Sequence, residues 1–153
     1  MLFLLYRLDE NRYALDVRLV AEVLPWVSVT PVTGSPPEVA GVLNYRGAPV
    51  PVLDLSQLIV QRPAHRRLST RVVVVHCPDE RGAAHFLGLI VEGATETMRI
   101  EDGHFNSIGV NNKAGRHLGP VAMDDRGFVQ RTDLDLLLSP KIRRRLFRPS
   151  AEA

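Results

Sequence analysis

The chain of 153 residues has the length of one ordinary domain, and its 45% hydrophobic and 24% charged residues argue against wholesale disorder. The formal net charge is only +2, and without the basic residues near the C-terminus the remainder is slightly acidic, which argues against a broad nucleic-acid-binding face. The 11 glycines and 11 prolines interrupt helices and favour short strands joined by turns. We therefore expect an all-β protein.

The sequence also indicates the cellular compartment. The single cysteine, Cys77, rules out an intramolecular disulfide and is typical of a reducing cytoplasm. The apolar start, residues 1–6, is stopped by Arg7 and Asp9 and is shorter than a secretory signal core. No apolar run approaches the roughly 18 residues that cross a bilayer. We expect a cytoplasmic protein that could sit beside a membrane receptor.

The first elements in chain order are a hairpin and a helical turn. Residues 2–8 and 13–17 are apolar runs on either side of a polar break, which predicts a β-hairpin. Val17, Val20 and Leu24 then recur at helical spacing, which predicts a short helix or helical turn that Pro25 ends. The breaker-rich residues 30–37 predict a surface connection.

A second hairpin is expected from residues 39–45 and 49–55, with a tight turn at 46–48. Pro49 and Pro51 cannot donate ladder hydrogen bonds, so this strand is expected at a sheet edge or a barrel corner. The polar and basic residues 61–69 predict a hinge between two lobes.

The second half of the chain predicts further strands and a terminal helix. The expected strands cover residues 72–75, 84–91, 94–100, 118–123 and 127–131, with a long loop at 102–117 and a hairpin formed by the last two. Ser139 and Pro140 fit the start of a helix, and Ile142 and Leu146 fall on one of its faces. We expect this helix to dock on the strands.

The residues that could carry chemistry do not form a known catalytic or metal-binding pattern. The five histidines show no paired spacing with carboxylates. His76 and Cys77 are adjacent on a strand and point to opposite faces. Asp133 and Asp135 lie in an expected strand before the terminal helix, as capping or solvated acids. We expect no enzyme activity, no cofactor and no metal.

One segment carries a family resemblance. Gly41-Val42-Leu43-Asn44-Tyr45-Arg46-Gly47, followed by Pro51-Val52-Leu53-Asp54-Leu55, resembles the signature of the CheW-like chemotaxis coupling proteins, which is close to G-V-I-N-L-R-G and then P-V-x-D-L. Weaker matches at residues 13–24, 30–32, 87–91, 98–100 and 134–138 extend the resemblance over nearly the whole chain.

The resemblance implies one CheW-like domain over residues 1–153, built of two small SH3-like five-stranded β-barrels packed together with short helices and a C-terminal helix. The lobes would be roughly 14–68 and 69–131, with the N-terminal strand and the C-terminal segment packed on them. It also implies a non-catalytic scaffold of two-component signalling, recruited to membrane receptor arrays. Its partners would be the cytoplasmic tip of methyl-accepting chemoreceptors and the regulatory domain of a CheA-type histidine kinase.

The resemblance also assigns residues. The family-motif positions are Gly41, Asn44, Arg46, Gly47, Pro51, Asp54 and Leu55. The receptor-binding positions are Leu4, Val17, Val20, Arg46 and Ala94, which would line a groove between the barrels. Plain core packing is the alternative for the apolar four, and an ion pair that pins Arg46 onto Asp54 is the alternative for the arginine.

The chain departs from the family pattern at three places: Tyr45 replaces a leucine, Glu92-Gly93-Ala94 replaces Asp-Arg-Val, and Arg131 enters an apolar strand. These departures fit an alternative chemosensory pathway as well as swimming. The rival interpretation from another class is a small β-barrel that binds nucleic acid through its basic C-terminal residues.

Overall fold

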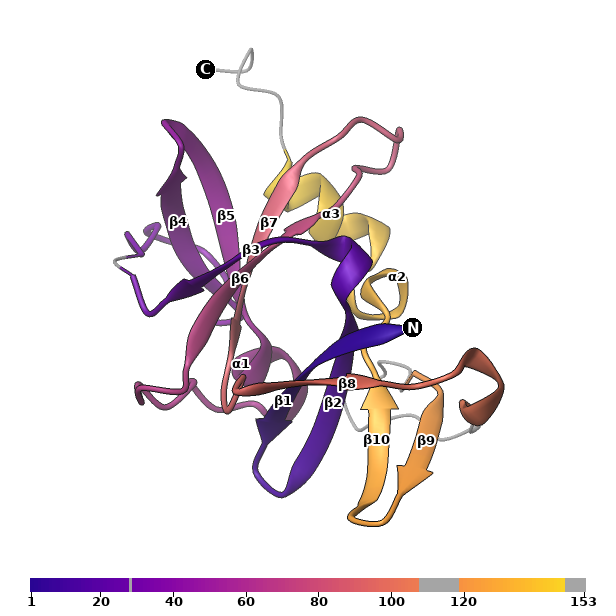
Figure 1. The fold of residues 1–153 in the computed structure, drawn as a ribbon. Coiled ribbons are helices and arrows are strands. Elements are labelled where there is room, and N and C mark those ends of the chain that lie inside the picture. The colour runs from indigo at the N-terminus through magenta and orange to yellow at the C-terminus, as the bar shows by residue number, and fades with distance from the viewer. Residues whose placement is uncertain (28, 108–118, 148–153) are drawn as a thin grey trace.

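The computed structural model describes residues 1–27, 29–107 and 119–147. Within these residues the chain forms two five-stranded sheets with short helices around them, which confirms the all-β prediction (Figure 1). The sheet we call the split sheet runs β8 (Glu96–Arg99), β1 (Leu2–Leu8), β2 (Asn11–Asp16), β10 (Gly127–Arg131), β9 (Val121–Asp124). The central sheet runs β3 (Val20–Pro25), β6 (Arg71–His76), β7 (Phe86–Val91), β5 (Ala48–Asp54), β4 (Val39–Tyr45).

The split sheet joins strands from the two ends of the chain. The hairpins β1–β2 and β9–β10 are both antiparallel, as the sequence predicted, and β10 lies parallel to β2. The long loop after β8 contains a 3-10 turn at Asp102–His104, and its part at 108–117 lies outside the described residues. The N-terminal and C-terminal strands therefore form one sheet.

The two sheets divide the chain differently from the predicted lobes at 14–68 and 69–131. Strands β6 and β7 were expected in the second lobe, but β6 pairs with β3 and β7 pairs with β5, both in the central sheet. The segment 61–69, predicted as a hinge, connects α1 to β6, and the strands before and after this connection, β5 and β6, belong to the same sheet. Strand positions follow from local pattern, whereas pairing between distant strands depends on which faces meet in the core.

The helix predicted over Val17 to Leu24 is only one turn long. A 3-10 turn covers Val17–Leu19, and Val20–Pro25 is strand β3. The register of β3 on β6 shifts between Val20 and Glu22, which indicates a β-bulge. The bulge breaks strict alternation, so the spacing of the apolar residues imitates that of a helix.

In the β4–β5 hairpin, β4 has the predicted bounds, whereas β5 begins and ends one residue earlier than predicted. The turn is therefore two residues long, and Arg46 (φ 52°) and Gly47 (φ 84°) are both left-handed. This is the backbone that a tight hairpin turn with the right twist needs. The predicted edge position of the second strand is wrong, because β5 lies between β7 and β4. Its prolines are nevertheless tolerated, since β7 pairs only with Val52–Asp54 and leaves the proline-bearing half of β5 without that neighbour.

A short helix, α1 (Leu55–Val60), follows β5 and was not predicted. Asp54 caps it by accepting hydrogen bonds from the backbone of Ser56 and Gln57. Leu55 and Leu58 are buried. The six residues are too few to show a helical period, so the sequence analysis ended the strand at Leu55 and assigned no element to residues 56–60.

Alternation along the strands fills three hydrophobic clusters. In β1, Phe3 and Leu5 join the cluster inside the split sheet, whereas Leu4 and Tyr6 join a larger cluster that also takes side chains from the central sheet. In β6, Val73 and Val75 join this larger cluster, and the alternate residues Val72 and Val74 join the cluster inside the central sheet. The larger cluster is the shared core that holds the two sheets together.

The C-terminal segment packs on the shared core. The predicted strand around Asp133 and Asp135 is wrong, because Leu134–Leu137 is a single helical turn, α2, with Asp133 as its cap. Helix α3 (Pro140–Leu146) begins with Ser139 as its cap, as predicted. Both Ile142 and Leu146 pack against the shared core, which confirms their expected face.

We expect Ile142→Ala to lower the stability of the protein by about 1–2 kcal/mol, because a half-buried apolar side chain is removed from the shared core. The exposed Arg145 in the same helix provides a matched control, Arg145→Ala. Thermal unfolding of both variants checks this, and equal melting temperatures would show that α3 does not contribute to the core.

Candidate functional site

The family-motif glycines and Asn44 shape the β4–β5 hairpin. The Asn44 side chain accepts a hydrogen bond from the Gly47 backbone at 2.9 Å, which closes the turn. A Cβ atom at Gly41 would lie 2.0 Å from the carbonyl oxygen of Thr30, so only glycine lets these backbones approach. Pro51 lies opposite Val42 on the neighbouring strand. These positions therefore build the scaffold on which Arg46 is displayed.

Asp54, the motif aspartate, is buried and has a structural role. Besides capping α1, its second carboxylate oxygen accepts a hydrogen bond from the Ala64 backbone at 2.9 Å. Burial raises the pKa of Asp54, and these backbone hydrogen bonds oppose the shift. Its hydrogen-bond partners are backbone groups, so the alternative in which Arg46 is pinned by an ion pair with Asp54 is wrong.

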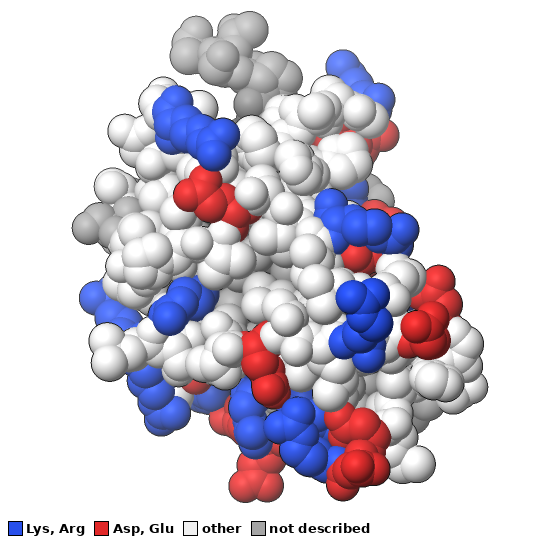
Figure 2. Space-filling view, viewed as in Figure 1, with Lys and Arg blue, Asp and Glu red and all other residues white. Residues whose placement is uncertain are grey.

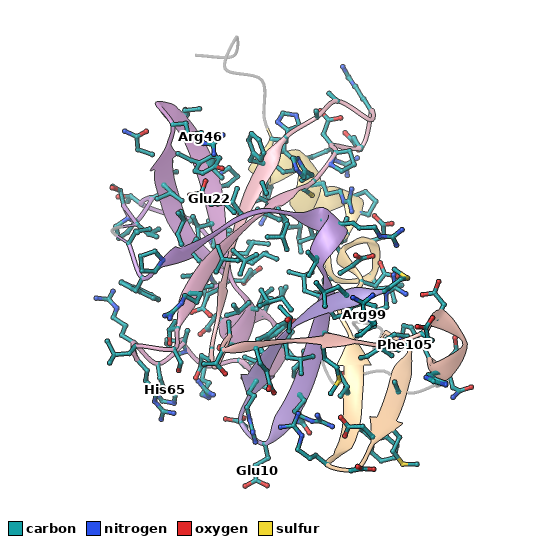
Figure 3. All side chains as sticks on the ribbon, viewed as in Figure 1. Glu10, Glu22, Arg46, His65, Arg99 and Phe105 are labelled. Atoms are coloured by element: carbon teal, nitrogen blue, oxygen red, sulfur yellow. The ribbon has the colours of Figure 1, made fainter. Side chains whose placement is uncertain are left out.

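Arg46 pairs with Glu22 instead (Figure 3). A guanidinium nitrogen of Arg46 lies 3.1 Å from the Glu22 carboxylate, and the guanidinium lies 5.1 Å from the centre of the Tyr45 ring. The Tyr45 hydroxyl donates to the same carboxylate at 2.9 Å. The Arg46 side chain remains 75% exposed, so its guanidinium is held in place and is still accessible to a partner.

A groove of about 500 Å³ surrounds this ion pair, and we call it the Arg46 groove. It lies between β3 and β4, the two outer strands of the central sheet. Its lining residues are Glu22, Leu24, Val27, Leu43, Asn44, Tyr45 and Arg46. The apolar floor and the charged rim are the composition expected of a surface that binds protein side chains.

The four apolar positions that were predicted to bind a receptor all meet at the shared core. Leu4 and Ala94 are only 8% and 7% exposed, so they contribute to packing. Val17 and Val20 are half-buried and pack against the same cluster, at the junction of the 3-10 turn with β3. A partner could therefore contact Val17 and Val20, with Leu4 and Ala94 supporting them from below.

Strand β3 links these valines to the Arg46 groove. Val20, at the start of β3, packs on the shared core, and Glu22 further along the same strand holds Arg46. Of the five predicted positions, the accessible ones therefore lie in two places that β3 joins, and Leu4 and Ala94 are buried in the shared core. The sequence analysis missed Glu22, whose only signal was an acidic residue in an otherwise apolar stretch.

The sequence analysis also missed a buried polar network beside the shared core. Ser56 donates a hydrogen bond to the carboxylate of Glu92, and Arg62 donates to Glu92 at 2.9 Å and to Asp9 at 2.8 Å. Asp9 lies in the β1–β2 turn, so Arg62 connects the split sheet to the segment that follows α1. The departure from the family pattern at Glu92 therefore has a structural role here.

The pH dependence of Asp54 and Glu92 should differ in sign. Burial alone would raise the pKa of Glu92, but hydrogen bonds from Ser56 and Arg62 hold it below its usual value. The stabilisation from Glu92 is therefore present at neutral pH and is lost as the pH falls through its folded-state pKa. The pKa of Asp54 is raised, so its contribution becomes more favourable as the pH falls.

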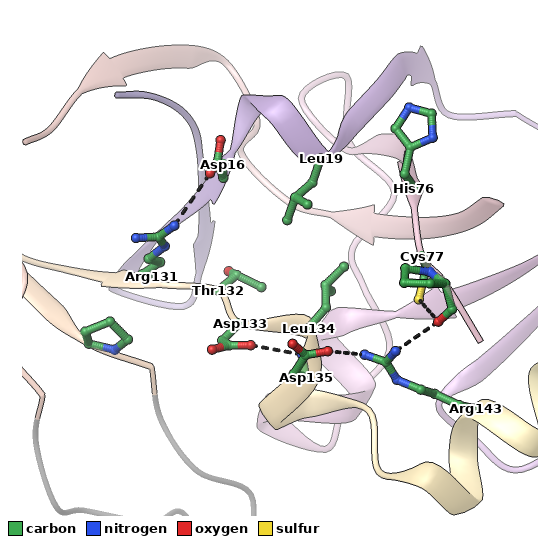
Figure 4. A pocket seen from close by; sticks show the side chains of 12 residues that line it. Asp16, Leu19, His76, Cys77, Arg131, Thr132, Asp133, Leu134, Asp135 and Arg143 are labelled. Carbon is green, nitrogen blue, oxygen red and sulfur yellow. Dashed lines mark hydrogen bonds and ion pairs between the residues drawn. The ribbon is translucent and has the colours of Figure 1, made fainter. Parts of the chain in front are cut away.

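A second hollow, of about 390 Å³, lies where the ends of β2, β6 and β10 meet α2 and α3 (Figure 4). Its charged groups are paired with one another. Arg131 lies 3.5 Å from Asp16, and Arg143 lies 2.6 Å from Asp135 and donates to the Pro78 carbonyl. These pairs hold the C-terminal segment against the sheets.

Residues with potential chemistry are placed apart. Cys77 is buried, and burial raises the pKa of its thiol, which disfavours the reactive thiolate. His76 is exposed. Among the described residues no group of three or more His, Cys, Asp or Glu side chains could hold a metal ion. In the same part of the chain no helix is long and apolar enough to span a bilayer.

Comparison with known proteins places this architecture in a family. A family model described as the CheW-like domain matches residues 2–141. Because the match covers nearly the whole sequence, the chain belongs to the CheW-like domain family. The solved structure of the scaffolding protein TtCheW from Thermoanaerobacter tengcongensis is similar, with a TM-score of 0.76 at 25% identity, over 90% of this chain and 87% of that one.

Curated relatives agree with this assignment. The chemotaxis protein CheW of Thermotoga maritima is 24% identical over 133 residues, which is 87% of this chain and 84% of that protein. CheW of Rhizobium meliloti is 24% identical over 97 residues, or 63% of this chain. The match spans 59% of the Rhizobium meliloti protein, which is less than two thirds of its length.

We expect Asp54→Asn to destabilise the fold by about 1–2 kcal/mol, because an amide has one acceptor oxygen and cannot serve both α1 and Ala64. Arg46→Ala should leave stability nearly unchanged, since its ion pair is exposed. Urea unfolding of both variants checks the assignment. Equal losses of stability would contradict the structural role given to Asp54.

Proposed function

We propose that this protein is a non-catalytic adaptor that couples methyl-accepting chemoreceptors to a CheA-type histidine kinase. The observation that carries the proposal is the CheW-like match over residues 2–141. The structural neighbour is a scaffolding protein, which supports the same role. The accessible features described above, a groove and half-buried valines, suit binding to protein partners.

The receptor's cytoplasmic tip is proposed to contact Val17, Val20 and Arg46. Supporting features are the partial exposure of the two valines and the accessible guanidinium of Arg46, which can donate further hydrogen bonds while it is held by Glu22. Leu4 and Ala94 are buried, so they would act indirectly, by holding this surface in position. The kinase is proposed to bind elsewhere on the two sheets through its regulatory domain.

The proposed location is the cytoplasm, with recruitment to membrane receptor arrays through the receptor. Both a swimming response and an alternative chemosensory output fit this role. The unusual residues Tyr45 and Arg131 take part in local contacts, with Glu22 and with Asp16 respectively. Their presence is therefore compatible with either output.

The nucleic-acid alternative is less well supported. It depended on the basic residues near the C-terminus, and two of these are engaged within the protein. Arg143 binds Asp135 and the Pro78 carbonyl, and Arg144 lies 3.5 Å from Glu80. A nucleic-acid site would need such cations to be available to phosphates.

We expect the purified protein to bind the regulatory domain of the CheA-type kinase from the same cell, without turnover of nucleotides. The interface should form between folded domains, so binding should need no large rearrangement. Pull-down and calorimetry with the cognate kinase measure this. A folded protein that binds no such kinase would contradict the proposed function.

We expect Val20→Glu and, separately, Arg46→Ala to weaken receptor binding about tenfold or more while kinase binding is retained. The half-buried Val20 can place a carboxylate in water at moderate cost, and the exposed Arg46 leaves no buried charge behind. Titration with a soluble receptor fragment measures both affinities.

The matched control for the first variant is Val23→Glu, because Val23 lies on the same strand and is 42% exposed. It should bind the receptor normally. Loss of the folded state in Val20→Glu would assign Val20 to the core. Unchanged receptor affinity in folded Val20→Glu and Arg46→Ala would contradict the proposal that these residues contact the receptor.

A further inference from the structure

The loop between α1 and β6 is strongly basic. Residues 61–71 read Gln-Arg-Pro-Ala-His-Arg-Arg-Leu-Ser-Thr-Arg and contain four arginines, one histidine and no acidic residue. His65, Arg66, Arg67 and Leu68 are all exposed, and Leu68 is exposed to 95%. The nearly fully exposed Leu68 therefore directly follows two exposed arginines.

The loop is held in a defined shape by buried groups. Thr70 is fully buried, and its hydroxyl donates to the His65 carbonyl at 2.5 Å and accepts from the Arg67 backbone at 3.2 Å. The Ala64 backbone is bound to Asp54, and the Ser69 carbonyl accepts a hydrogen bond from the Ala94 backbone at 3.1 Å. The exposed side chains are therefore presented on a fixed backbone, which lowers the entropy lost on binding.

Most of the positive charge on this loop is not neutralised. Arg62 is paired with Asp9 and Glu92. In the part of the chain that the structure describes, Arg66, Arg67 and Arg71 form no ion pair with a carboxylate. Arg71 instead donates to the carbonyls of Leu68 and Thr70 within the loop. Figure 2 shows arginine side chains in blue at the lower left, where Figure 3 labels His65.

We propose that Arg66, Arg67 and Leu68, which we call the basic loop surface, form a docking site for an acidic segment of a partner protein that carries an apolar side chain. The guanidinium groups of Arg66 and Arg67 can bind carboxylates in bidentate fashion, and Leu68 supplies an apolar contact next to them. The inference does not depend on the receptor and kinase roles proposed above, since it uses none of their residues.

The same observations favour protein over nucleic acid. Single-stranded nucleic acids bind where bases can stack on free aromatic faces beside cations. The aromatic ring next to this loop, that of Trp26, is already covered by Arg66, whose guanidinium lies 4.8 Å from the ring centre. A stacking base would have to displace that cation.

A lipid surface is a poorer fit as well. Peripheral membrane binding uses a face with several large apolar side chains beside the basic ones. Here Leu68 is the single residue of the exposed run 65–68 that is apolar. One leucine next to two arginines matches a short acidic peptide with one or two apolar side chains more closely.

The test uses the full chain and a fluorescent synthetic peptide in which glutamates flank a central pair of leucines. A second peptide carries glutamine in place of each glutamate. Fluorescence anisotropy should show binding of the acidic peptide that weakens with added salt, and little binding of the glutamine peptide. The variant Arg66→Glu with Arg67→Glu should lower the affinity about tenfold or more, and Leu68→Ser a few-fold.

The control variant combines Arg81→Glu with Arg99→Glu, since both arginines are exposed and the net charge changes equally. It should bind the acidic peptide as the parent does. If both double variants weakened peptide binding equally, the effect would come from overall charge alone. That result would overturn the proposal. Tighter binding of single-stranded DNA or of vesicles with anionic lipid than of the peptide would also overturn it.

Discussion

The burial of both faces of strands β1 and β6 is the constraint on which the rest of the structure depends. Each strand gives one face to the interior of its own sheet and the other face to the shared core. Neither sheet could expose that second face to water without leaving a large apolar patch. The two sheets are therefore stable only as a pair, and the segments between them, including Val17 and Val20, are fixed by the same packing.

Polar groups at the margin of the shared core set the relative position of the sheets. Hydrophobic contact is not directional, so it fixes distance better than orientation. The ion pairs of Arg62 with Glu92 and Asp9 are directional, and they join an element of each sheet. Removing Arg62 would leave the buried carboxylate of Glu92 without its ion-pair partner. This loss costs more than the pair contributes.

Local signals in the sequence predicted most strands, but not their partners. The β4–β5 hairpin could be predicted because its turn, its glycines and its apolar runs are all within a few residues of one another. The pairing of β10 with β2 could not, because it joins residues more than 110 positions apart. For the same reason the ion-pair alternative considered for Arg46 named Asp54, which is near in sequence, whereas Glu22 meets Arg46 only after the fold has placed β3 and β4.

Arg46 also occupies a backbone conformation that arginine does not favour. At φ 52° a residue with a Cβ atom is less stable than glycine by about 1 kcal/mol, and asparagine would fit the turn better. The exposed contact with Glu22 contributes at most about 1 kcal/mol, so it does not exceed this cost. The stability of the hairpin therefore does not explain the arginine at the turn, whose accessible guanidinium lies in the Arg46 groove beside an apolar floor.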